Sequence, residues 1–123
     1  MRDRLGALPL FADLDDAQLD RLAAATTEFE ARAGQPLIQH GAAGSGMFVL
    51  ELGQAIVDAP EGARELGPGD IFGERALLGK DIERTARVRA RTDVRCLAIA
   101  RPEIERLLAE DPRVAERLSQ LSA

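Results

Sequence analysis

Residues 67–90 read GPGDIFGERALLGKDIERTARVRA, and this stretch decides how the rest of the chain is interpreted. Its first four residues, GPGD at 67–70, are typical of a tight turn that follows a strand. Residues 75–78 then predict a short helix that Gly79 ends. Gly73, just before that helix, has no side chain and permits a close approach of the backbone to a ligand. The stretch therefore predicts a turn, a ligand-facing glycine and a helix start in succession.

The same stretch carries two side chains of complementary chemistry, Glu74 and Arg84. Amides at the start of the short helix lack intrahelical partners, so they offer donors and partial positive charge to an anion. The guanidinium of Arg84, at the head of the next predicted strand, can grip two phosphate oxygens in a planar fork. A carboxylate only accepts hydrogen bonds, so Glu74 suits a sugar hydroxyl. The pair describes a site for a ribose phosphate; the alternative is a structural ion pair across a turn.

At the end of this stretch, Thr85–Arg91 alternates between small apolar residues and arginines, which predicts a strand. Its three arginines would share one face, and we interpret them as a solvated outer face. A nucleic-acid-binding stripe would interleave aromatic residues, and the chain has no Tyr or Trp, so we expect no direct nucleic-acid contact. Arg95–Ala100 predicts the last strand, with Cys96 as a small core residue.

Helical signals flank a region of strand-like periodicity. Residues 16–26 predict a helix that Asp13 or Asp15 caps. From Glu28 to about Ala59 the apolar period is two, and turns rich in glycine and proline separate short runs, which is typical of a small antiparallel roll or barrel. In the C-terminal segment after residue 100 the apolar residues return to helical spacing. Asp111-Pro112 ends one helix there and starts another.

Composition limits the class of protein. A chain of 123 residues predicts one domain. One cysteine cannot form an internal disulfide or a cysteine-based metal site, and the single histidine, His40, excludes multi-histidine centres, so we expect no metal. The net charge is −5, yet residues 75–101 carry eight basic side chains against three acidic ones, which favours a small anionic ligand. No stretch fits a signal peptide or a membrane-spanning segment, so we expect a cytoplasmic protein.

FGERALL at 72–78, followed by ERTARVRA at 83–90, resembles the phosphate-binding cassette of the cyclic nucleotide-binding domain family. That family includes the catabolite activator protein, the regulatory subunits of cyclic-AMP-dependent protein kinase and cyclic-nucleotide-gated channels. The likeness extends over almost the full chain, and Gly34, Gly41 and Gly53 stand where the family's strand turns carry glycines. The resemblance implies an α+β, mainly β fold, an antiparallel, jelly-roll-like β-roll flanked by N- and C-terminal helices.

The resemblance also implies a division of the chain. Residues 1–123 would form a single cyclic nucleotide-binding domain. It would comprise an N-terminal helical lead-in at 1–27, a β-roll at 28–100 with its phosphate-binding cassette at 72–86, and C-terminal helices at 101–123.

Five cassette residues receive roles from the resemblance. Gly73, through its backbone, and Glu74, through its carboxylate, would bind the ribose 2′-hydroxyl. The backbone amide of Ala76 would face the cyclic phosphate, Arg84 would form an ion pair with it, and Thr85 would hydrogen-bond it. The implied ligand is cyclic AMP (cAMP). Cyclic GMP (cGMP) also fits physically, because a threonine after the arginine can accept a hydrogen bond from the guanine 2-amino group.

The implied function is a cyclic-nucleotide-binding sensor or regulatory domain, not an enzyme, whose C-terminal helices relay ligand occupancy. The alternative is an interaction module of the same fold that no longer binds a nucleotide, and the intact cassette weighs against it. Family members often close the base pocket with an aromatic residue of the last helix, which this tail lacks. Its candidates for a lid are Arg113, Arg117, Leu118 and Leu121. The effector, a further domain or a protein partner, is left open.

Overall fold

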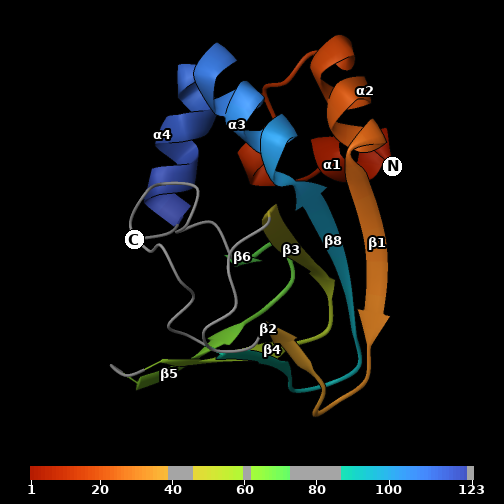
Figure 1. Ribbon diagram of the computed structural model, residues 1–123, viewed down its shortest axis with the longest axis vertical. Coiled ribbons are helices and arrows are strands. Elements are labelled where there is room, and N and C mark those ends of the chain that lie inside the picture. Colours follow the sequence, from red (N-terminus) through yellow and green to blue (C-terminus); the bar gives the residue numbers. More distant parts are fainter. Residues whose placement is uncertain (39–45, 60–61, 73–86, 122–123) are drawn as a thin grey trace.

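Two antiparallel sheets form the body of the protein, which a computed structural model describes for residues 1–38, 46–59, 62–72 and 87–121 (Figure 1). Within these residues each sheet has four strands, in the orders β1-β8-β3-β6 and β2-β7-β4-β5. The strands are β1 (Thr26–Ala31), β2 (Pro36–Ile38), β3 (Gly46–Leu52), β4 (Ala55–Ala59), β5 (Gly62–Leu66), β6 (Ile71–Phe72), β7 (Arg87–Ala90) and β8 (Val94–Ala100). Strands that are far apart in sequence, such as β1 and β8, pair with each other, as in a roll.

Helices from both ends of the chain gather at one end of the roll (Figure 1). Those before β1 are α1 (Arg2–Gly6), the 3-10 helix η1 (Pro9–Phe11) and α2 (Asp16–Ala24); those after β8 are α3 (Arg101–Glu110) and α4 (Pro112–Leu121). The predicted fold class, a mainly β antiparallel roll flanked by N- and C-terminal helices, is confirmed. None of the helices in the described ranges is long and apolar enough to cross a membrane.

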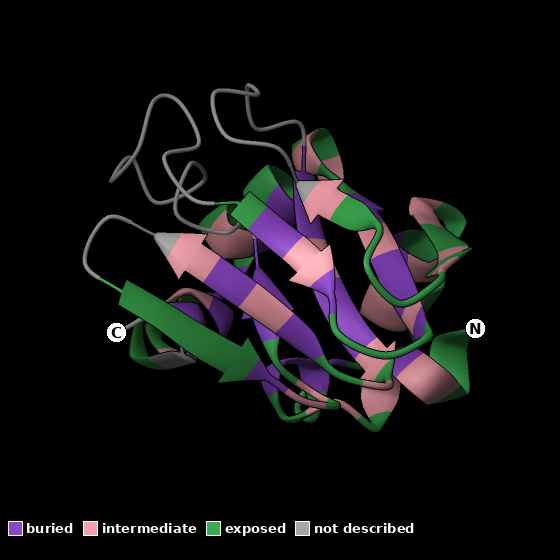
Figure 2. Ribbon diagram, turned by 90° about the horizontal axis from the view of Figure 1, so that it is seen from below, coloured by how far each residue is buried: buried purple, intermediate pink, exposed green. Residues whose placement is uncertain are grey.

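Burial alternates along the strands, as the bands of colour in Figure 2 show. The buried side chains form two apolar cores. The helix-side core consists of Leu5, Leu10, Phe11, Leu14, Leu22, Met47, Val49, Ile71, Leu97, Ile99, Ile104, Leu107, Val114 and Leu118. The roll core takes residues from both sheets: Leu50, Ala55, Val57, Leu66, Phe72, Val88, Ala90, Val94 and Cys96. Cys96 is thus a small core residue, as predicted, and burial raises the pKa of its thiol to about 11.

A capping box starts α2. Asp15 Oδ1 accepts from the Gln18 amide at 2.8 Å, and Gln18 Oε1 accepts from the Asp15 amide at 3.0 Å. Of the two candidates, Asp13 and Asp15, it is therefore Asp15 that caps the helix. The helix ends two residues earlier than predicted, because Thr26 is already the first residue of β1 and pairs with Ile99 of β8. The Thr26 hydroxyl donates to the Leu22 carbonyl oxygen at 2.7 Å.

Ion pairs tie α1 to the first sheet. Arg4 Nε donates to Glu51 Oε2 of β3 at 2.7 Å, and Arg4 Nη2 donates to Glu28 Oε1 of β1 at 2.7 Å. Arg95 Nε of β8 donates to Glu51 Oε1 at 2.7 Å. The hydrogen bonds from Arg4 and then Arg95 hold the pKa of Glu51 below its ordinary value. One carboxylate therefore joins a helix to two adjacent strands.

The turn between β3 and β4 generates a stability prediction. Gly53 has a φ of 90°, and a Cβ there would lie 2.3 Å from the Asp93 carbonyl oxygen. Gly53→Ala should therefore lower the free energy of unfolding by more than the roughly 1–2 kcal/mol that left-handed backbone costs an L-residue.

Two other glycines serve as controls in the same urea-denaturation series. Gly34 shares the φ of 90° but has open space around it, so Gly34→Ala should show the backbone cost alone. Gly67 has neither feature, so Gly67→Ala should change stability little. Equal losses for the variants at 53 and 34 would contradict the steric contribution at Gly53.

Candidate functional site

The predicted ligand-binding residues lie outside the described residues; they are Gly73, Glu74, Ala76, Arg84 and Thr85. The predicted helix at 75–78, His40 and Gly41 lie outside them too. The structure describes the strands on either side, since β6 ends at Phe72 and β7 begins at Arg87. In the part of the chain that the structure describes, no group of His, Cys, Asp and Glu side chains could hold a metal ion.

A tight turn leads into β6. The Asp70 amide donates to the Gly67 carbonyl oxygen at 3.0 Å, and the Gly67 amide donates to Asp70 Oδ2 at 2.7 Å. Pro68 and Gly69, whose φ is 92°, occupy the two central positions, as in a type II turn. The Gly69 amide also donates to the Leu50 carbonyl oxygen of β3 at 2.7 Å. The turn predicted at 67–70 is confirmed, and it is fixed to β3.

The two residues of β6 point into different cores. Ile71 pairs with Val49 and lies in the helix-side core, whereas Phe72 pairs with Phe48 and lies in the roll core. The Phe72 and Phe48 rings stack, with centroids 5.2 Å apart and planes inclined by 14°. Phe29 meets Phe48 edge-on, with centroids 6.0 Å apart. The alternation between Glu28 and Ala59 predicts strands but does not indicate this aromatic cluster, which depends on the pairing of distant strands.

On the other side, β7 is held at the centre of the second sheet. It pairs with β4 and β2, and Val88 stands opposite Val57. Val88 and Ala90 are buried in the roll core, the core that also receives Phe72. Phe72, the last described residue before 73, and Val88, the second described residue after 86, therefore lie in one apolar cluster.

Arg87 and Arg89 of β7, and Arg91 directly after it, face outward. Arg89 Nε donates to Asp58 Oδ2 at 3.0 Å, and Arg91 Nη1 lies 2.7 Å from Glu65 Oε1. Arg87 is exposed. The interpretation of these arginines as a solvated outer face is confirmed.

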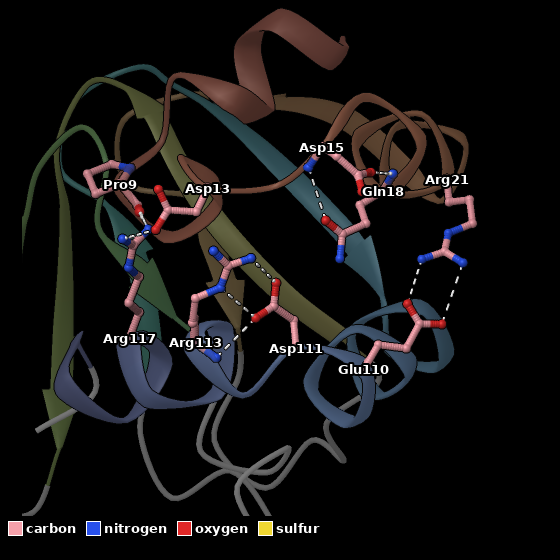
Figure 3. Close-up of polar contacts among 9 residues, drawn as sticks. All are labelled: Pro9, Asp13, Asp15, Gln18, Arg21, Glu110, Asp111, Arg113 and Arg117. Atoms are coloured by element: carbon pink, nitrogen blue, oxygen red, sulfur yellow. Dashed lines mark hydrogen bonds and ion pairs between the residues drawn. The ribbon is translucent and has the colours of Figure 1, made fainter.

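Polar contacts dock the C-terminal helices against the N-terminal ones (Figure 3). Arg117 of α4 pairs with Asp13, and its Nη1 donates to the Pro9 carbonyl oxygen at 3.0 Å. Arg21 Nη2 of α2 donates to Glu110 Oε2 of α3 at 2.6 Å. The Glu110 hydrogen bond raises the pKa of Arg21 above its ordinary value. Both contacts join segments from opposite ends of the chain.

Asp111, at the junction of α3 and α4, is buried and caps α4 as predicted. It accepts from the Arg113 amide and from Arg113 Nε at 3.1 Å each, and these bonds hold its pKa below its ordinary value. Leu118 is buried in the helix-side core. Three of the four lid candidates, Arg113, Arg117 and Leu118, are thus engaged within the helices. The side chain of the fourth, Leu121, lies outside the described residues.

The docking contacts of α4 predict a change in its dynamics. Arg117→Met keeps an unbranched side chain but removes the bonds to Asp13 and to the Pro9 carbonyl, so amide hydrogen exchange within α4 should become faster. Arg106→Met is the matched control, because the ion pair of Arg106 with Glu103 lies within α3. Hydrogen-exchange mass spectrometry measures both variants, and wild-type exchange in α4 of Arg117→Met would contradict the docking role.

Known proteins match this chain over most of its length. Residues 28–111 match the family model of the cyclic nucleotide-binding domain. A cyclic nucleotide-gated potassium channel of Rhizobium etli is 33% identical over 114 residues, which are 93% of this chain and 32% of the channel. A cAMP-dependent protein kinase regulatory subunit of Aspergillus fumigatus is 35% identical over 107 residues, which are 85% of this chain and 26% of that subunit. The chain spans about a third or less of these curated relatives.

Solved structures share the fold. The N-terminal domain of a transcriptional regulator from Streptomyces coelicolor superposes with a TM-score of 0.68 and 32% identity, over 98% of this chain and 89% of that one. The regulatory domain of Toxoplasma gondii PKA, crystallised with cAMP, has a TM-score of 0.82 at 22% identity, over 97% of this chain and 47% of that one. The regulatory subunit of a cAMP-independent protein kinase A from Trypanosoma brucei has a TM-score of 0.82 at 27% identity, over 96% of this chain and 45% of that one. With the family model matching well over half of its residues, this chain belongs to the cyclic nucleotide-binding domain family.

Proposed function

We propose that this domain binds a cyclic nucleotide, cAMP in preference to cGMP, and acts as a regulatory sensor. The observation that carries the proposal is the complete set of Gly73, Glu74, Arg84 and Thr85, at the spacing of the family's cassette. Membership of the family supports it. The common anchoring of β6 and β7 in the roll core also supports it, because a binding segment with fixed ends loses less conformational entropy when it closes on a ligand.

Each cassette residue has a part in this proposal. Gly73 offers its backbone and Glu74 its carboxylate to the ribose 2′-hydroxyl. The Ala76 amide faces the cyclic phosphate, Arg84 forms the ion pair with it, and Thr85 hydrogen-bonds it through hydroxyl and amide. The site needs no metal, because a guanidinium and backbone amides supply the positive charge that the phosphate requires.

The relay to the C-terminal helices is part of the same proposal. Its support is that α3 follows β8 directly and that α4 is held by the contacts of Arg117 at its exposed edge. Exposed ion pairs contribute little free energy and are screened by salt, so a small change in packing is enough to release them. Ligand binding then alters how α4 docks, and a downstream effector would respond to that change.

An interaction module without a ligand is the second candidate. The Trypanosoma brucei neighbour favours it, since that protein of similar fold is the regulatory subunit of a cAMP-independent protein kinase A. The two candidates differ in one measurement, which is whether the purified domain binds a cyclic nucleotide.

Removing the Arg84 guanidinium, the proposed partner of the phosphate, should abolish tight cAMP binding. Arg84→Ala should weaken cAMP binding by about 2–5 kcal/mol, because the buried phosphate loses its cationic side-chain partner. Isothermal titration calorimetry measures the loss. Arg87→Ala is the matched control, because Arg87 stands three residues further along and is exposed. If the Arg84 variant bound cAMP as wild type does, or if both variants lost affinity equally, the role of Arg84 would be wrong.

Ligand preference should depend on the Thr85 hydroxyl. The end of the last helix offers no acidic acceptor for the ring N–H and amino group of guanine beyond Glu116, so discrimination should be weak and cAMP should bind better. Thr85→Ala should lower cGMP affinity more than cAMP affinity, whereas Thr85→Ser keeps a hydroxyl and should keep the wild-type ratio. Side-by-side titrations test this, and wild-type binding of cGMP more than about tenfold tighter than cAMP would overturn the preference.

A further inference from the structure

The described part of β6 leads directly into the proposed binding segment. It consists of Ile71 and Phe72, and both pair with β3. Backbone hydrogen bonds with Leu50 of β3 fix Gly69 and Asp70 just before it, and the packing of the two β6 side chains extends this attachment to Phe72. Ile71 is 6% exposed and Phe72 is 2% exposed, so each is fixed by packing in its own core.

Phe48 contacts the Phe72 side chain on the roll-core face. The two residues stand directly opposite each other in the antiparallel register, and their rings stack at 5.2 Å. On the other side of β3, Phe48 stands opposite the small residue Ala98. The Phe29 ring reaches over this position from β1 and abuts Phe48 edge-on, with planes at 87°. An aromatic row therefore runs from β1 through β3 to β6.

We propose that Phe48 is a positioning residue for the ribose-binding end of the cassette. Phe72 is covalently followed by Gly73 and Glu74, the two residues assigned to the 2′-hydroxyl, so the Phe48 ring fixes the point from which both depart. The Ala76 amide, which faces the phosphate, follows on the same side, but the two phosphate-binding side chains, those of Arg84 and Thr85, lead into β7, which is held by the second sheet. Loss of the stack should therefore impair ribose recognition more than phosphate recognition. The inference rests on the proposed function.

A comparison of two ligands separates positioning from general stability. Phe48→Leu keeps an apolar residue but removes the ring, so it should weaken cAMP binding about tenfold while changing the affinity for 2′-deoxy-cAMP much less. Phe11→Leu is the matched control, because Phe11 is fully buried in the helix-side core, away from the aromatic row. It should lower the unfolding temperature and leave the ratio of the two affinities at its wild-type value.

Calorimetry well below the unfolding temperature of each variant gives both affinities. Phe48→Tyr keeps a stacking ring and should restore the wild-type ratio, and Phe48→Met replaces the leucine variant if that one does not fold. A wild-type affinity ratio in the leucine or methionine variant would overturn the positioning role while leaving the proposed function intact. A wild-type protein that binds neither ligand would overturn both.

Discussion

β3 pairs with β8 along one edge and with β6 along the other, while its side chains alternate between two cores. Met47 and Val49 enter the helix-side core, and Leu50 enters the roll core. A shift of the register by one residue would exchange these side chains between a helix-packed face and the interior of the roll. The same register sets where the turn at 67–70 meets β3 and where β6 ends. The rest of the structure depends on this pairing.

The two residues of β6 thus face opposite sides of one sheet. Ile71 belongs to the core that contains Val114 and Leu118 of α4, and its neighbour Phe72 belongs to the core that contains Val88 of β7. Close-packed interiors transmit small displacements, so a shift of β6 on ligand binding would reach α4 through side chains in contact. The relay therefore needs no contact between the nucleotide and α4. The exposed pairs of Arg117 with Asp13 and of Arg21 with Glu110 contribute little free energy to this docking.

Much of the fold followed from local sequence signals. The Asp15 cap, the turn at 67–70 and the alternation along β7 each depend on residues that are close in sequence, and the structure contains all three. The start of β1 at Thr26 and the stack of Phe48 on Phe72 were not predicted, because both depend on partners far along the chain and on the register of the sheet. Residue types and spacing indicated Gly73, Glu74 and Arg84, and the family resemblance added Ala76 and Thr85. Their roles remain predictions, since the distances among them depend on a segment outside the described residues.

Titration of the isotope-labelled domain with cAMP, followed by the amide resonances of its backbone in NMR spectra, tests the central claim most directly. The account predicts saturable, one-to-one shifts that are largest for residues 73–86 and extend to Phe72 in β6 and Val88 in β7. The absence of saturable shifts would contradict it, as would shifts confined to the outer-face arginines of β7, which would indicate unspecific attraction of an anion to exposed positive charge.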